Sequence, residues 1–153
     1  MNREIEFRGI NGYGFMYGTY IKGDGEHTKD RIFLLQYNER TGEEDGICAP
    51  VEPDTVGQYT GVDDKNGDRI YEGDIVAMHD PFSKESHFGE VEFSKGSFGV
   101  RYTVYKDWEN FWPLSKTMAV YEDMGCRDEK SVSFEVIGNT YENPELLTKT
   151  KDK

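Results

Sequence analysis

A run of acidic and amide side chains around Gly67 has the residue types of a calcium-binding loop: Asp64, Asn66 and Asp68. An EF-hand loop needs glycine at its sixth position and acidic residues at its first and twelfth positions. If Gly67 is sixth, Val62 is first and Gly73 is twelfth, so the EF-hand pattern fails. We therefore predict a tight turn between two strands, because Asn and Gly tolerate the positive φ angles that such a turn demands.

Four potential metal ligands lie close together further along the chain: His79, Asp80, Glu85 and His87. Imidazole and carboxylate groups bind zinc when their spacing brings them to one side of the backbone. The spacing here follows neither the period of a helix nor that of a strand. We predict a solvent-exposed loop over residues 80–87, with a metal site as the alternative, and we predict no cofactor.

No segment matches a known catalytic or phosphate-binding motif. Gly12 and Gly14 match the start of a dinucleotide fingerprint, but Gly18 follows one position too late. No Gly-x-Ser-x-Gly elbow is present. Cys48 and Cys126 lie far apart and have no neighbouring histidine to activate them, so we expect a reduced pair. The chain is therefore predicted not to be an enzyme. A composite carboxylate site is the alternative, because acidic residues are numerous.

The densest aromatic cluster consists of Trp108, Phe111 and Trp112. Such side chains can pack in a core, anchor a protein interface or stack on the bases of a single strand. Asp107 and Glu109 lie beside them and oppose base stacking. Core packing and a protein interface both stay open, and the three aromatic residues are our candidate interface.

The composition is strongly acidic. The 153 residues include 30 Asp and Glu against 18 Lys and Arg, which gives a net charge of −12. Direct nucleic-acid binding is not expected, because such a surface repels phosphates. The acidic surface serves solubility, docks a basic partner or mimics a nucleic acid. Because the sequence has no leader pattern and no long apolar run, we expect a cytoplasmic protein that does not bind membranes.

The elements that position these residues are predicted to be mainly strands. An aromatic content of 14% and alternating apolar residues favour β-structure. The expected strands are residues 3–9, 15–21, 31–37, 56–62, 69–71, 75–78, 89–93, 98–104 and 132–137. The continuous apolar centre of residues 31–37 predicts a strand that is covered on both faces. Residues 38–46 are interpreted as an acidic connection or hairpin loop, and residues 108–118 as a helix, a strand or a loop.

These elements predict a mainly β, antiparallel, α+β fold. We expect a β-rich N-terminal subdomain over residues 1–53, ending at the prolines, and an SH3-like small barrel over residues 54–148. A short C-terminal helix is predicted, since Asn143 can cap it and Pro144 suits its first position. Residues 149–153 are expected to fray.

Three segments resemble the YopX family of uncharacterised phage and prophage proteins from Gram-positive bacteria. They are residues 51–61 (VEPDTVGQYTG), the pair Asn66-Gly67 together with residues 70–76 (IYEGDIV), and residues 135–147 (EVIGNTYENPELL). Residues 7–10 (FRGI) depart from the Phe-Arg-Ala-Trp that often opens the family. The turn residues within the resemblance are Gly57, Gln58, Asn66, Gly67, Gly73 and Asp74.

The resemblance supplies no catalytic residues. It implies a phage origin and a small cytoplasmic protein that self-associates, with trimers as one form. Our functional hypothesis is a non-enzymatic, homo-oligomeric interaction protein whose further partner is an unidentified phage or host protein. The alternative is an acidic decoy that mimics nucleic acid and occupies a host nucleic-acid enzyme.

Overall fold

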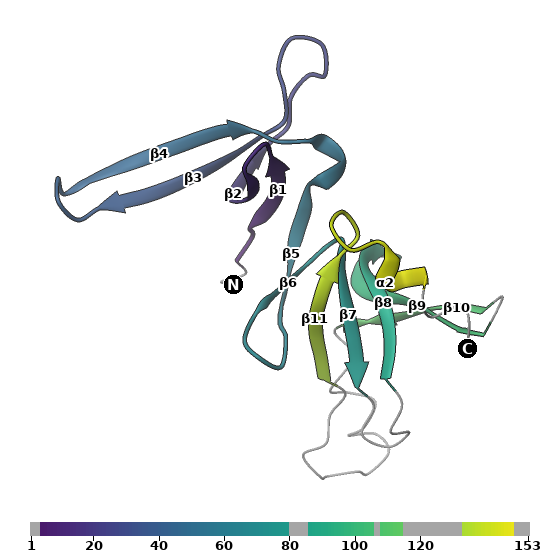
Figure 1. The fold of residues 1–153 in the computed structure, drawn as a ribbon. Helices are drawn as coiled ribbons and strands as arrows, with labels where there is room; N and C mark the ends of the chain where they lie inside the picture. Colours follow the sequence, from purple (N-terminus) through teal and green to yellow (C-terminus); the bar gives the residue numbers. More distant parts are fainter. Residues whose placement is uncertain (1–3, 80–85, 106–107, 115–132, 149–153) are drawn as a thin grey trace. The chain divides into compact units, whose positions relative to one another are not determined.

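The computed structural model is built almost entirely from antiparallel strands (Figure 1). It describes residues 4–79, 86–105, 108–114 and 133–148. The chain divides into two compact units, Met1–Gly61 and Val62–Lys153. The predicted β-rich fold class is confirmed. The predicted subdomain break after residue 53 lies within a short 3-10 helix, η1 (Pro53–Thr55), whereas the compact units separate after Gly61.

The first unit contains four complete strands and most of a fifth. They are β1 (Phe7–Asn11), β2 (Gly14–Ile21), β3 (Arg31–Asn38), β4 (Glu43–Pro50) and β5 (Gly57–Asp63). The strand order of the sheet is β4-β3-β2-β1-β5-β6, with β6 formed by Arg69–Tyr71. Its buried apolar residues are few: Ile32, Val51 and Tyr59. The exposed residues of this sheet are concentrated in β4 and in the second half of β3.

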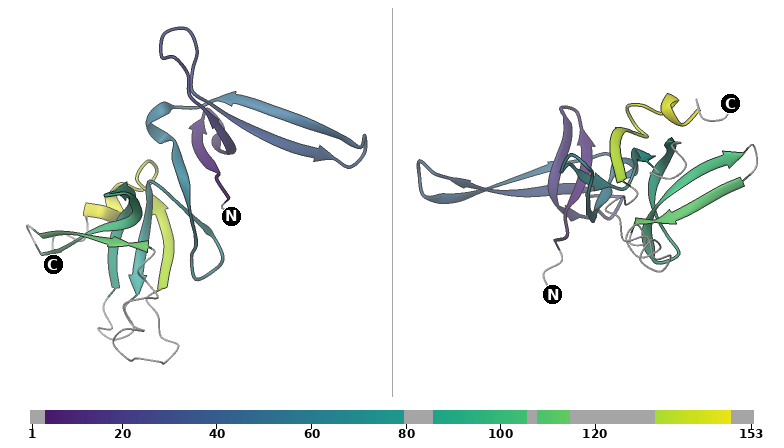
Figure 2. Two further views of the ribbon diagram at one scale, coloured as in Figure 1. Left: turned by 180° about the vertical axis from the view of Figure 1, so that it is seen from behind. Right: turned by 90° about the horizontal axis from the view of Figure 1, so that it is seen from below.

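Strands β3 and β4 form a ribbon that extends beyond the other strands of the unit, and Figure 2 shows it from two further sides. Strand β2 pairs only with the first three residues of β3, whereas β4 pairs with all eight. We call the unsupported part, residues 34–47, the arm. The prediction that β3 is covered on both faces was wrong: Leu35 and Tyr37 are 53% and 66% exposed. The interpretation of residues 38–46 as a loop was wrong from Glu43 onward, because β4 begins there.

The second unit is built on a five-stranded sheet with the order β10-β9-β8-β7-β11. These strands are β7 (Asp74–His79), β8 (Ser86–Ser94), β9 (Ser97–Tyr105), β10 (Trp108–Pro113) and β11 (Ser133–Asn139). A short helix, α2 (Glu145–Thr148), follows and packs beside β8. The undecided segment from residue 108 is thus a strand as far as Pro113, and the residues from 115 to 118 lie outside the described part.

One face of this sheet carries a dense apolar core. Its fully buried members include Ile70, Val76, Val91 and Val100, and Trp112 packs against them. The predicted turn around Gly67 is confirmed, since Gly67 has φ +89° between β5 and β6, and Lys95 and Gly96 also have positive φ where β8 turns into β9. Closure of the sheet into an SH3-like barrel stays a prediction.

Among the described residues, no helix has the length and apolar character to cross a membrane.

Candidate interaction surface

The β3–β4 ribbon has two distinct faces, because cross-strand partners project to the same side and successive residues alternate. We define face A by the pairs on one side: Arg31 with Pro50, Phe33 with Cys48, Leu35 with Gly46, and Tyr37 with Glu44. Face B carries the alternating pairs: Ile32 with Ala49, Leu34 with Ile47, Gln36 with Asp45, and Asn38 with Glu43.

The middle of face A is apolar and open to solvent. Phe33 is half-buried, Cys48 is exposed, and Leu35 and Tyr37 have the exposed fractions given above. The ring of Phe33 lies against Gly46, where an added Cβ would come within 2.6 Å of its Cε2 atom. Glycine therefore lets this ring lie flat along the ribbon, and the apolar surface continues toward the free end of the arm.

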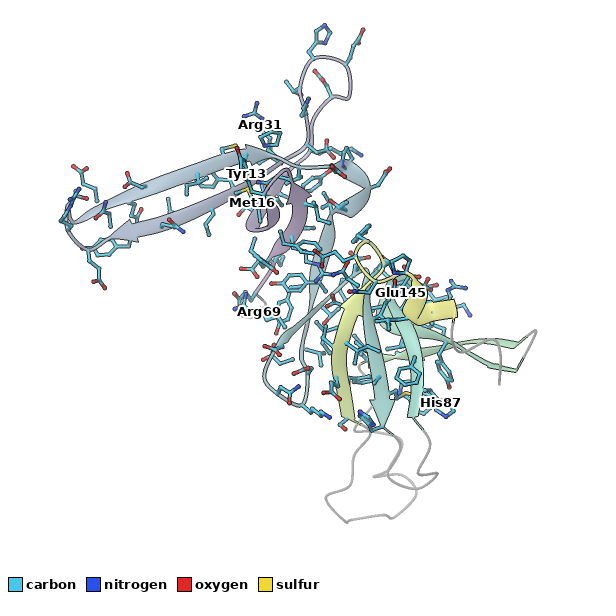
Figure 3. The ribbon with its side chains drawn as sticks, in the orientation of Figure 1. Tyr13, Met16, Arg31, Arg69, His87 and Glu145 are labelled. Carbon is cyan, nitrogen blue, oxygen red and sulfur yellow. The ribbon has the colours of Figure 1, made fainter. Side chains whose placement is uncertain are left out.

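The two ends of face A carry opposite charges. Arg31 lies at the base of the ribbon, where Figure 3 shows its side chain pointing away from the strands, and Glu44 lies near the tip. Both residues are exposed, and neither makes an ion pair with any other residue that the structure describes. The two charged rows lie six positions apart along β3, which corresponds to about 20 Å along an extended strand.

Face B differs in its charge pattern. Its charged residues, Glu43 and Asp45, are both acidic, and Asn38 Nδ2 donates a hydrogen bond of 3.3 Å to Asp45 Oδ2. Ile47 is 45% exposed on this face. Face B thus offers apolar surface with negative charge alone, whereas face A has both signs.

The base of the ribbon is fixed by Asp30. Its Oδ2 atom accepts a hydrogen bond from the Tyr20 hydroxyl, and its Oδ1 atom accepts one of 2.8 Å from the Gly23 N–H. The hydrogen bond from Tyr20, and then that from Gly23, lowers the pKa of Asp30. The same bond to the Asp30 carboxylate raises the pKa of Tyr20 to about 12. This pair ties the end of β2 to the start of β3.

In the second unit, Asp64 organises the turn that was predicted around Gly67. Its Oδ1 atom accepts the backbone N–H groups of Asn66 (2.7 Å) and Asp68 (3.0 Å), and its Oδ2 atom accepts that of Val136 (3.1 Å). Burial raises the pKa of Asp64, but these hydrogen bonds outweigh it and lower the pKa overall. Turn chemistry, rather than calcium binding, accounts for these residues, and the bond to Val136 secures the turn against β11.

The predicted family turn at Gly73 and Asp74 meets the C-terminal family segment. The buried Asp74 Oδ2 atom accepts the Tyr71 N–H at 2.7 Å, and the Gly73 carbonyl accepts the Thr140 N–H at 2.8 Å. Gly73 has φ +79°, a left-handed conformation that favours glycine. The two segments of the resemblance therefore touch, and their polar groups hold the backbone together.

The remaining family turn residues also lie in backbone structure. Gly57 pairs with Arg8 and Gln58 pairs with Phe7, where β5 joins β1. Gly57 is buried. Both residues position a strand.

The aromatic candidates are not one continuous surface. In β10, Phe111 pairs with Arg101 and Trp112 pairs with Val100, so the two aromatic side chains project from opposite faces of the sheet. Trp112 packs against the core, while Phe111 lies over Gly99. Trp108 is the first residue of β10. The structure describes its backbone but not its side chain. A role for these residues in an interface stays a prediction.

The two histidines of the metal hypothesis also project to opposite faces. His79 pairs with Ser86 and His87 pairs with Met78, so the rings point away from one another across the sheet. Asp80 and Glu85 lie outside the described residues. No group of three potential ligands comes together within the ranges that the structure describes. The predicted loop over 80–87 was wrong at its end, since β8 begins at Ser86.

A charged cluster on β11 was not predicted from the sequence. Glu135 Oε2 lies 2.7 Å from Lys65 Nζ and 3.3 Å from His79 Nε2. The hydrogen bond from Lys65, and then that from His79, lowers the pKa of Glu135. The three residues are far apart in sequence, so only the pairing of β7 with β11 and the Asp64 turn could bring them together.

Comparison with known proteins decides the family. The YopX protein family model matches residues 6–148, which is most of the chain. The chain belongs to the YopX family. A crystal structure of protein EF1440 from Enterococcus faecalis is similar to this YopX protein, with 22% sequence identity and a TM-score of 0.51. The similarity covers 95% of this chain and 99% of EF1440, and it supports the fold alone. No curated protein matches the chain significantly.

Proposed function

We propose that this YopX protein is a non-enzymatic, self-associating interaction protein of phage origin that acts in the cytoplasm of the host bacterium. The observation that carries the proposal is the exposed apolar surface of face A on the arm. Trimers are one form that the family resemblance implies, and an unidentified phage or host protein is the expected further partner. We expect no direct binding to nucleic acid or membranes.

The arm is an energetically unusual element for an isolated chain. A two-stranded ribbon is at best marginally stable in water without a further layer to cover its apolar residues. Leu35 and Tyr37 expose more than half of their surfaces there. Contiguous exposed apolar side chains mark interaction surfaces in soluble proteins. A partner that covers face A would therefore stabilise the arm and remove this surface from water.

The polar residues of the family motif support a non-enzymatic role. Asp64 and Asp74 are buried carboxylates, and each accepts backbone N–H groups. A catalytic carboxylate must instead reach a substrate in a concave site. The most distinctive acidic residues of the motif are thus committed to holding strands and turns.

Size-exclusion chromatography coupled to light scattering tests the proposal. Over a range of concentrations, we expect a molar mass that is a whole multiple of the 17.6 kDa chain. A monomer that persists up to millimolar concentration would contradict self-association.

The acidic decoy is a second candidate, supported by the charge of the end of the arm. Around the tip, Arg40 is accompanied by four acidic residues: Glu39, Glu43, Glu44 and Asp45. Affinity capture from host lysate at low and high salt tests this function. A basic nucleic-acid enzyme that is recovered only at low salt would support the decoy, and recovery of the bait alone would contradict it.

A further inference from the structure

We propose that face A of the β3–β4 ribbon pairs with face A of a second copy, antiparallel and around a two-fold axis. The inference rests on the proposed self-association and assigns it to one surface. In a two-fold contact the same patch serves both copies, so that patch must be complementary to itself. The charge pattern and the apolar centre of face A meet this condition.

The charges are complementary only in the antiparallel arrangement. Arg31 and Glu44 mark opposite ends of face A. When two ribbons stack with their strands antiparallel, β3 lies over β3, and the row of Arg31 faces the row of Tyr37 and Glu44 of the second copy. The guanidinium can then meet the Glu44 carboxylate and the face of the Tyr37 ring, which also attracts a cation. The symmetry makes each contact occur twice.

The apolar rows match in the same arrangement. The axis passes between the row of Phe33 and Cys48 and the row of Leu35 and Gly46. Phe33 of each copy therefore faces Leu35 of the other, and Cys48 faces the row of Gly46, over which the Phe33 ring of that copy lies. Ile21, which pairs with Arg31 and is 47% exposed, extends the apolar surface at the base.

A second copy suits face A better than other occupants do. A basic partner would place positive charge beside Arg31, and an acidic partner would place negative charge beside Glu44. Either partner would therefore repel one end of face A. Face B does not have this self-complementarity, because it carries Glu43 and Asp45 but no basic residue that could face them in a second copy. The alternation of the strand therefore separates two functions: face A fits a second copy, and face B stays available to a basic partner.

Charge exchange in separate chains tests the pairing. Copies with Arg31→Glu place two acidic residues opposite each other at both ends of the interface, and copies with Glu44→Arg place two basic residues there. Each variant alone should weaken association by roughly tenfold or more, because like charges meet in place of opposite ones. Mixing the two variants restores both opposite-charge contacts, so sedimentation velocity should show a dimer in the mixture.

Glu43→Arg is the matched control, since Glu43 is the sequence neighbour of Glu44 and projects from face B. It changes the net charge by the same amount and should leave the dimer constant within about twofold of wild type. Circular dichroism verifies that all three variants fold.

The outcomes separate this inference from the proposed function. If wild type associates but the mixture does not recover, or if Glu43→Arg weakens association as strongly as Glu44→Arg, another surface mediates self-association and the face A pairing is wrong. A mass of three chains also overturns it, because a two-fold contact yields even-numbered assemblies. A wild-type monomer at all concentrations overturns the pairing and the proposed function together.

Discussion

At the residue scale, the buried carboxylates of Asp64 and Asp74 accept hydrogen bonds from backbone N–H groups. Asp64 joins its own turn to β11, and Asp74 closes the turn between β6 and β7. Charged acceptors make stronger hydrogen bonds than neutral ones, and a buried carboxylate needs several of them to offset its desolvation. The hydrogen bonds of Asp64 and Asp74 thus hold turns and strands of the second unit together.

Replacing Asp64 with Asn should destabilise the second unit. The single amide oxygen of Asn can accept hydrogen bonds either from the Asn66 and Asp68 N–H groups or from the Val136 N–H group. The amide NH2 group then faces the remaining N–H donor, which loses its acceptor. We expect the free energy of unfolding to fall by about 2 kcal/mol, the typical cost of a buried donor without a partner. Urea denaturation measures the change. Asp68→Asn is the control because its side chain is exposed. Equal stability of both variants would contradict the role of Asp64.

The Tyr20–Asp30 bond should give the base of the ribbon a defined pH dependence. The folded pKa of Asp30 lies below its usual 3.8, so the stabilisation is present above that value and is lost as the pH falls through the lowered pKa. The folded pKa of Tyr20 rises from 10.0 to about 12, so stabilisation is complete below 10.0 and is lost as the pH rises toward 12.

Tyr20→Phe tests this dependence. The difference in unfolding free energy between wild type and the variant should be greatest between about pH 5 and 9 and should shrink on both sides. Chemical denaturation across this pH range measures it. Tyr13→Phe is the control, because that side chain is fully exposed at 101%. A difference that stays constant with pH would show that the hydroxyl contributes nothing to the base of the ribbon.

At the element scale, turns and strong strands could be predicted from the sequence, but the arm could not. The Asn66-Gly67 pair predicts a tight turn, and the alternation of apolar and polar residues predicts strands β8 and β9. Both signals depend only on residues that are neighbours in the sequence. Strand β4 has an acidic and glycine-containing sequence, and it is a strand because β3 pairs with it along its whole length. Tertiary pairing overrides weak intrinsic preference here.

The exposure of β3 was unpredictable for a related reason. A run of apolar residues indicates burial, and the sequence cannot say whether a covering layer comes from the same chain. Leu35 and Tyr37 are residue types that are typical of a covered strand. Nothing in the described part of the chain covers them. The charged cluster of Lys65, His79 and Glu135 was equally hidden, because it depends on the register of β7 with β11.

Amide hydrogen exchange should reveal whether the arm depends on association. In an unpaired chain, amides of residues 34–38 and 43–47 should exchange much faster than those of β7, since a two-stranded ribbon opens readily. In the associated protein they should be protected, and dilution should remove this protection. Mass-spectrometric exchange at two concentrations, with β7 as internal control, measures the effect. Protection of the arm that does not depend on concentration would contradict coupling between the arm and association.

At the scale of the whole molecule, the two units differ in how they use their apolar residues. The second unit buries Ile70, Val76, Val91 and Val100 in its own core. The first unit has few buried apolar residues and presents others on an exposed ribbon. We infer that the second unit is a scaffold that folds through its own contacts, while the first unit mediates association. Both belong to one family match, so the division is a property of the YopX protein and not of an added segment.

Cys48 allows a direct test of this division in the wild-type chain. In the face A pairing, the two Cys48 residues lie on facing ribbons about 10 Å apart, the usual spacing of stacked sheets, and they are offset by about two residues along the strand. This distance is too long for a disulfide, whose Cα atoms lie within about 7 Å. We therefore expect that a bis-maleimide of about 10 Å span links two chains efficiently. Mild oxidation should not link them through Cys48.

The controls assign any cross-link to the β3–β4 ribbon. Cys126→Ser, which leaves Cys48 alone, should retain the cross-link, and Cys48→Ser should abolish it. Adding Glu44→Arg to Cys126→Ser should lower the yield, whereas adding Glu43→Arg should not. Denaturing gel electrophoresis reads out all of these results. A cross-link that persists in Cys48→Ser, or a yield that does not respond to Glu44→Arg, would place association outside the arm, and the apolar residues of face A would then need a different partner.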